Sequence, residues 1–112
     1  MDNSTQSFFD DIMQALQKVQ SIKGNDIPFW VGETNWPTGG ADFKNAVPSV
    51  DHAASYWKNA ICPMVGWGIN VFVFEAFDEP WKPAEKNNDV EQHWGVMDVN
   101  GKPKYDLSCP RV

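Results

Sequence analysis

Basic residues are scarce in this sequence. Its 112 residues include nine lysines and arginines against fifteen aspartates and glutamates, which gives a formal net charge of −6. Binding to nucleic acid depends on an excess of Lys and Arg that neutralises phosphates, so we expect no nucleic-acid partner. An acidic chain of this kind suits a neutral substrate.

Long apolar runs and cysteines are scarce too. No stretch approaches the roughly 20 consecutive apolar residues of a transmembrane helix, so we expect no membrane span. The two cysteines, Cys62 and Cys109, lie far apart without a C-x-x-C pattern. This spacing argues against a metal site and leaves two buried thiols as the simplest interpretation. Met1 is followed by polar residues rather than by a basic and then an apolar run, so no signal peptide is predicted. We predict no cofactor.

Two amphipathic stretches predict helices. Apolar residues recur at helical spacing over 7–23, beginning at a capping-box-like sequence at Ser7 and followed by Gly24 as a stop signal. A second helix is expected to begin at an N-cap, Ser49. Pro63 should end this helix near residue 61 because proline cannot donate the next backbone hydrogen bond.

Two shorter apolar runs, residues 27–31 and 70–77, predict strands, the second one covered on both faces. The order helix, strand, helix, strand predicts an α/β fold. A right-handed crossover would place the strands side by side and parallel, with both carboxyl ends at one edge. Glu33 after the first strand and Asp78 and Glu79 after the second would then lie at the same rim.

This rim combines acids with aromatic residues. Enzymes with parallel strands present catalytic groups at the carboxyl ends, and sugar rings stack on flat surfaces such as Trp30 and Trp36. Retaining glycoside hydrolysis needs two carboxyl groups roughly 5–5.5 Å apart, one of which attacks the anomeric carbon. The simpler alternatives are an exposed loop carboxylate at Glu33, a weak surface ion pair between Glu79 and Lys82, and tryptophans that pack in the core.

Three segments together resemble one family. Residues 33–38 (ETNWPT) resemble the Glu-Thr-Gly-Trp-Pro segment around the nucleophile of family 17 glycoside hydrolases, the β-1,3-glucanases, and most of all their fungal cell-wall branch. Residues 74–82 (FEAFDEPWK) resemble the end of the eighth strand in that family, and residues 91–95 (EQHWG) resemble its closing segment. Asn35 stands where the family usually has glycine. If that position needs a positive φ, asparagine is the least costly substitute.

The resemblance implies that residues 1–112 are the C-terminal portion of a (β/α)8 TIM barrel, incomplete as given, because such a barrel needs roughly 250 residues. It implies β-1,3-glucan as the substrate and a secreted or cell-wall location. Glu33 would be the nucleophile, and Glu79 and Lys82 would line the active cleft. The sugar site would be shaped by two aromatic residues, Trp36 and Trp81. It also favours a disulfide between Cys62 and Cys109 over free thiols.

One part of the family's chemistry has no counterpart. The general acid/base of the family is the glutamate of an Asn-Glu pair on the fourth strand, and this sequence contains no Asn-Glu pair. Other glutamates (Glu75, Glu79, Glu85 and Glu91) lie on the segments that match the end of the barrel. We therefore predict no useful glucanase activity for the separate chain. The alternatives are a non-catalytic glucan-binding or cell-wall structural fragment, and a chain without an independent fold, since two strands make a poor sheet.

Overall fold

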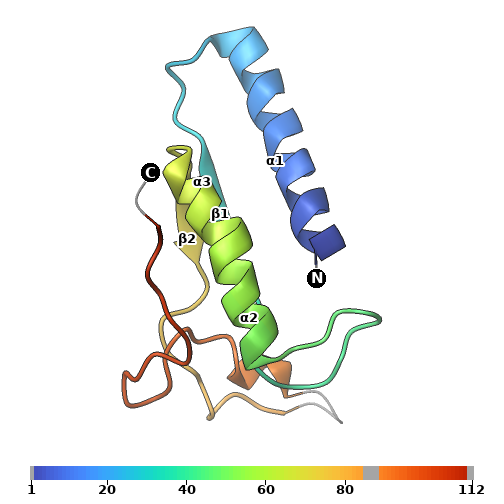
Figure 1. The fold of residues 1–112 in the computed structure, drawn as a ribbon, viewed down its shortest axis with the longest axis vertical. Coiled ribbons are helices and arrows are strands. Elements are labelled where there is room, and N and C mark those ends of the chain that lie inside the picture. The colour runs from blue at the N-terminus through green and yellow to red at the C-terminus, as the bar shows by residue number, and fades with distance from the viewer. Residues whose placement is uncertain (1, 85–88, 111–112) are drawn as a thin grey trace.

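The predicted order of helices and strands is present in the computed structural model, which describes residues 2–84 and 89–110 (Figure 1). Two helical rods lie against a two-stranded sheet, and irregular segments gather at one end. In chain order the elements are α1 (Asp2–Lys23), β1 (Trp30–Thr34), α2 (Val50–Tyr56), the π turn η1 (Trp57–Ile61), α3 (Cys62–Gly66), β2 (Asn70–Val73) and the 3-10 turn η2 (Val90–Gln92). No helix in the described part is both long and apolar enough to cross a membrane.

Helix α1 begins at Asp2, so the capping box predicted at Ser7 is wrong and Ser7 lies inside the helix. No proline or glycine stands between these two residues to interrupt the helix. The end of α1 is as predicted. Gly24 has a φ of 82°, and its N–H donates to the carbonyl oxygen of Gln20 at 2.8 Å, the usual glycine termination of a helix.

The second rod runs further than predicted. It continues through Pro63 to Gly66 because η1 widens the helix by one residue per turn, with the N–H of Cys62 bonded to the carbonyl of Trp57. Pro63 then occupies the first turn of α3, where a missing N–H costs little. The predicted N-cap is confirmed, since the side chain of Ser49 accepts a hydrogen bond from the following turn of α2.

Strands β1 and β2 pair in parallel, as predicted, with Trp30 opposite Asn70 and Val31 opposite Val71. β1 lies three residues later than predicted, so Glu33 is inside the strand rather than after it. The pairing becomes irregular between Val31 and Thr34.

β2 is shorter than predicted and ends at Val73. The N–H of Phe74 still donates to the carbonyl oxygen of Thr34 at 3.1 Å, and after Phe74 the chain turns toward residues 94–97. The N–H of Glu75 donates to the carbonyl oxygen of Trp94 at 3.1 Å, and the carbonyl of Glu75 accepts from the N–H of Val96 at 2.9 Å. The apolar run over 70–77 is therefore a strand only in its first half, and its second half bends and has a different partner.

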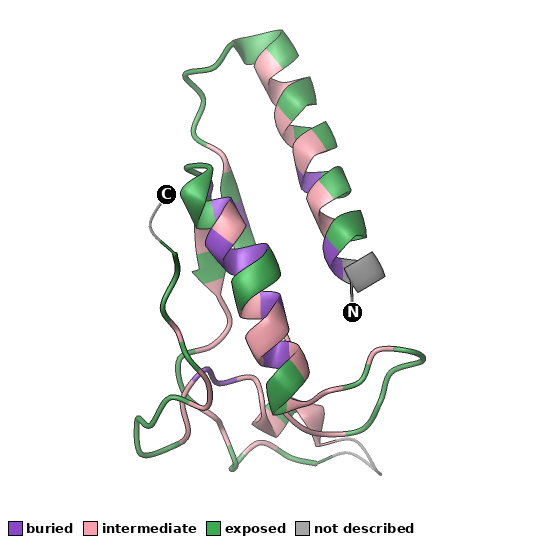
Figure 2. Ribbon diagram, in the orientation of Figure 1, coloured by how far each residue is buried: buried purple, intermediate pink, exposed green. Residues whose placement is uncertain are grey.

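The hydrophobic core lies between the sheet and the helices, where buried residues from both layers face one another (Figure 2). It comprises Ile12, Val31, Tyr56, Ala60, Ile61, Met64 and Ile69. The apolar face of α1 contributes only in part: Ile12 is buried, but Ile22 near the other end is 71% exposed.

The other face of the sheet is left open by the described residues, so the prediction that the second strand is covered on both faces is wrong for this chain. Trp30 and Phe72 stack there with ring centres 5.4 Å apart, and they are 55% and 58% exposed. The C-terminal segment instead packs along the second rod. It is held by a disulfide between Cys62 and Cys109 and by a 3.0 Å hydrogen bond from Trp57 Nε1 to the carbonyl oxygen of Leu107.

Candidate active site

The irregularity in β1 determines which way Glu33 faces. Val31 packs in the core, and Thr34 also faces the helices, because its Oγ1 lies 2.5 Å from the hydroxyl of Tyr56 on α2. Strict alternation would not place two residues three positions apart on the same face, so the extra residue of the irregular pairing is taken up between them. Glu33 is exposed and opens into a cavity that it shares with Phe74.

This cavity has a volume of about 330 Å³ and lies at the carboxyl ends of β1 and β2. Its walls are Glu33, Thr34, Asn35, Phe74, Glu91 and Trp94. Phe74, Glu91 and Trp94 are not among the site residues predicted from the sequence. The segments that contain these residues resemble a strand end and a closing segment of the family, which was the signal available in the sequence. Only the pairing of residues 75–77 with 94–97 brings those segments to Glu33.

Asn35 has a role that the sequence did not reveal. Among the described non-glycine residues only Lys44 has a positive φ, so the position of Asn35 does not require glycine. Asn35 Nδ2 donates to the carbonyl oxygen of Trp94 at 2.9 Å. The side chain therefore joins the end of β1 to the aromatic wall of the cavity.

Glu79 and Lys82 form a close ion pair, with Oε2 and Nζ 2.5 Å apart. The hydrogen bond from Lys82 lowers the pKa of Glu79, and the same bond raises the pKa of Lys82. Lys82 Nζ also lies 5.2 Å from the centre of the Phe74 ring, within the range of a cation–π contact. Phe74 thus connects the pair to the cavity of Glu33.

Glu75 lies next to this pair and is half-buried. Burial, and then the hydrogen bond and negative charge of Glu79, raise the pKa of Glu75 to about 7. The two neighbouring glutamates therefore have opposite behaviour: Glu79 stays ionised beside Lys82, whereas Glu75 retains a proton up to near neutral pH.

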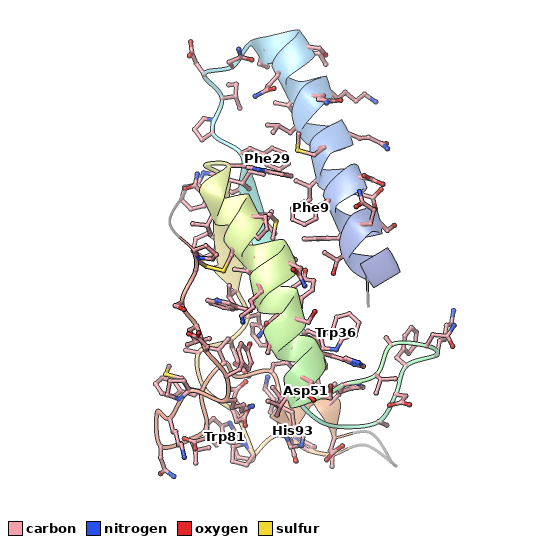
Figure 3. The ribbon with its side chains drawn as sticks, viewed as in Figure 1. Phe9, Phe29, Trp36, Asp51, Trp81 and His93 are labelled. Atoms are coloured by element: carbon pink, nitrogen blue, oxygen red, sulfur yellow. A yellow bond between two sulfur atoms is a disulfide. The ribbon has the colours of Figure 1, made fainter. Side chains whose placement is uncertain are left out.

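The two predicted aromatic residues lie in different surroundings (Figure 3). Trp36 is half-buried beside α2, with its ring centre 6.0 Å from that of Tyr56 and its Nε1 donating to the carbonyl oxygen of Val47 at 3.1 Å. Trp36 lines a second cavity of about 580 Å³, which shares Asn35 and Trp94 with the first. Trp81 is 70% exposed and lines neither cavity.

Asp78, predicted at the same rim, takes part in a structural network. Its Oδ1 accepts from Lys104 Nζ at 2.5 Å and from the N–H of Gly95 at 3.0 Å. Lys104 Nζ also donates to Thr38 Oγ1 at 2.8 Å. This network joins the segments after both strands to the C-terminal segment.

His93 has structural contacts as well. Its carbonyl oxygen accepts from the N–H of Thr38 at 3.0 Å, and its Nε2 lies 3.2 Å from Asp89 Oδ2. Within the described residues no cluster of three or more His, Cys, Asp or Glu side chains could hold a metal ion. Glu85 lies outside the described residues.

A carboxylate at the carboxyl edge of parallel strands, beside a cavity with aromatic walls, is typical of the active sites of α/β enzymes. The comparisons agree with this class. The model of the family "Glycosyl hydrolases family 17" matches residues 1–109, and the chain belongs to that family.

Similar proteins include a glucan 1,3-beta-glucosidase of Saccharomyces cerevisiae, 59% identical over 111 residues, which cover 97% of this chain and 36% of that protein. Among solved structures, a glycoside hydrolase family 17 beta-1,3-glucanosyltransferase from Rhizomucor miehei matches with a TM-score of 0.75 at 26% identity, over 96% of this chain and 38% of that one. An active-site mutant of the Rhizomucor miehei beta-1,3-glucanosyltransferase in complex with laminaritriose matches with a TM-score of 0.69 at 25% identity, over 89% and 36%. The chain thus spans little more than a third of the length of these relatives.

Proposed function

We propose that this chain supplies the nucleophile side of the active site of a retaining enzyme that acts on β-1,3-glucan. The observation that carries the proposal is the cavity at the carboxyl ends of two parallel strands, which Glu33 and Phe74 share. The names of the relatives, which include a glucan 1,3-beta-glucosidase and a complex with laminaritriose, support glucan as the substrate. A secreted or cell-wall location fits the disulfide between Cys62 and Cys109, because disulfides persist in oxidising environments.

Residues 1–112 would form the last two α/β units of a (β/α)8 barrel. Support comes from the uncovered face of the sheet, where Trp30 and Phe72 expose more than half of their surface. In a closed barrel the inner face of every strand is packed by side chains from the other strands. The remaining strands would cover this pair.

In the proposed reaction the Glu33 carboxylate attacks the anomeric carbon, and the bond from that carbon to the leaving oxygen breaks. A general acid must protonate that oxygen. Water or a second glucan hydroxyl then releases the sugar from Glu33. Glu79 and Lys82 bind sugar hydroxyls, while Trp36 and Trp81 provide apolar surface for the sugar rings.

The general acid is the missing part in the separate chain. Acid–base catalysis contributes a factor of about 10²–10⁴, so we expect the chain alone to release no measurable sugar from glucan. Reducing sugar released by the purified chain, and abolished by Glu33→Gln, would overturn this expectation.

The activity can be tested in a hybrid in which this chain replaces the matching segment of the yeast relative. The hybrid should release or transfer sugar from laminarin, and Glu33→Gln should abolish that activity. Asp26→Asn, which removes an exposed carboxylate on the turn between α1 and β1, is the matched control and should leave activity unchanged. A hybrid that remains active with Glu33→Gln would refute the proposed role.

A second candidate, glucan binding without catalysis, is favoured by the larger cavity lined by Trp36 and by the exposed ring of Trp81. It predicts that the separate chain binds insoluble β-1,3-glucan and that this binding survives Glu33→Gln. Loss of binding in that variant would exclude this candidate.

A further inference from the structure

Glu75 is held in place by its backbone and lacks a donor for its side chain. Hydrogen bonds to the carbonyl of Trp94 and from the N–H of Val96 fix its main chain on both sides. Its Oε1 is buried, and no described residue donates a hydrogen bond to it. The group within hydrogen-bonding reach of the Glu75 carboxyl is the carboxyl of Glu79.

Two ionised carboxylates have only acceptor oxygens, so a hydrogen bond between them requires a proton on one of the two. Glu79 is the poorer site for this proton, because it already accepts a hydrogen bond from the Lys82 ammonium. Glu75 is the better site, because it is more buried and burial penalises its charged form. Like-charge carboxyl pairs behave in this way when one environment favours the neutral acid.

We propose that Glu75 is a positioning residue that carries a proton and donates it to Glu79, and that this bond holds Lys82 above the ring of Phe74. The chain of contacts is continuous. The Glu75 carboxyl is within hydrogen-bonding reach of Glu79. Glu79 pairs with Lys82, and Lys82 Nζ lies 5.2 Å from the centre of a ring that lines the cavity of Glu33. One part of the inference rests on the proposed function: that Lys82 is held in place to bind a sugar.

The charges that act on Glu75 come from its own segment: Glu79 and Lys82, and more weakly Asp78, which is engaged by Lys104 from the C-terminal segment. Loss of the proton would place two carboxylates side by side. The Lys82 ammonium would then be attracted to both carboxylates rather than to Glu79 alone. We therefore expect the position of Lys82 over Phe74 to change when Glu75 ionises.

A titration of the 112-residue chain by nuclear magnetic resonance tests this without any sugar. The side-chain carboxyl carbon of Glu75 should titrate near pH 7. The ε-methylene protons of Lys82, shifted upfield by the Phe74 ring, should lose part of that shift over the same pH range. Titration of Glu75 near the usual value for a glutamate, or a Lys82 shift that ignores the titration of Glu75, would overturn the proposal.

Variants separate proton donation from packing. Glu75→Gln keeps a donor but cannot ionise, so the upfield shift of Lys82 should persist through pH 8. Glu75→Ala should lose most of that shift at every pH. The control Asp11→Asn, which removes an exposed carboxylate on α1, should leave the transition in place. A Glu75→Gln variant in which Lys82 still moves near pH 7 would refute the inference.

If Glu75→Gln does not fold, Glu79→Gln decides the question, because an amide supplies the missing donor and removes the like charge. The titration of Glu75 should then move to lower pH, and no movement would refute the inference. Laminaritriose binding is measured separately. If Glu75 titrates as expected but the chain binds no laminaritriose, the result would count against the proposed function. The hydrogen bond from Glu75 to Glu79 would still be supported.

Discussion

The hydroxyl oxygens of Thr34 and Tyr56 lie 2.5 Å apart and join the end of β1 to helix α2. Thr34 immediately follows Glu33, so this bond fixes the strand at the point where the proposed nucleophile leaves it. Tyr56 is buried, and burial raises the pKa of its hydroxyl, although the bond with Thr34 acts in the opposite direction. The bond is therefore between two neutral hydroxyls at all pH values at which the chain would work.

We expect Tyr56→Phe to lower the free energy of unfolding by about 1 kcal/mol, because the hydroxyl of Thr34 loses its partner. The hybrid with the yeast relative should also lose activity, since Glu33 is less firmly placed. Tyr105→Phe is the matched control. The hydroxyl of Tyr105 is buried without a partner among the described residues, so its removal should leave stability unchanged or raise it. Chemical denaturation measures both, and equal effects would contradict this account.

Lys104 should be important for stability. Lys104→Met would leave the largely buried Asp78 carboxylate without its cation, so we expect a loss of about 1–2 kcal/mol in the free energy of unfolding. Lys102→Met, two residues earlier and exposed, should change it by less than about 0.5 kcal/mol. Denaturation midpoints compare the two variants. Equal midpoints would mean that the network around Asp78 does not stabilise the fold.

The two tryptophans should separate binding from stability. Trp36→Ala should weaken glucan binding and also cost about 2 kcal/mol of stability, less than for a fully buried tryptophan, because its ring packs against Tyr56. Trp81→Ala should weaken binding alone, because the ring is 70% exposed. Pull-down on insoluble β-1,3-glucan, together with thermal melts, distinguishes these outcomes. A Trp81→Ala variant that binds as well as the parent chain would remove Trp81 from the proposed site.

Stability should fall as pH rises from about 4.5 to about 7. In this range the folded chain keeps the proton of Glu75, whose pKa is raised to about 7, whereas the unfolded chain releases it. Glu79 acts in the opposite direction. Its pKa is lowered in the folded chain, so the stability that it contributes is lost only when the pH falls below the ordinary pKa of a glutamate. Urea denaturation from pH 5 to 8 should show the fall in the parent chain, and Glu75→Gln should lack it. Parallel profiles would contradict the assignment.

Local sequence patterns were sufficient to predict the order of the elements, the parallel strands and the acid at their carboxyl edge. Ser49 and Gly24 act through their own backbone neighbourhoods, so their capping roles were also predictable. The extent of the second helix was not, because a π turn at Trp57–Ile61 accommodates Pro63 and no local residue signals such a turn.

The residues that line the cavity were harder to predict, because they meet through contacts between distant parts of the sequence. The direction of Glu33 depends on an irregular pairing with β2, and the wall formed by Trp94 depends on a hydrogen bond from Asn35, 59 residues earlier. Contacts over such separations leave no periodic pattern. The resemblance to the family indicated which residues to examine, and the geometry determined which of them meet.

The most direct test of the account is to trap the covalent intermediate in the hybrid enzyme. A 2-deoxy-2-fluoro laminari-oligosaccharide with a dinitrophenyl leaving group needs no general acid to react, and it leaves a long-lived ester on the nucleophile of a retaining enzyme. Peptide mass spectrometry should find one added sugar, on the peptide that contains Glu33, and none in Glu33→Gln. A sugar bound to any other carboxylate, or an active hybrid that traps none, would contradict the assignment of Glu33 as nucleophile.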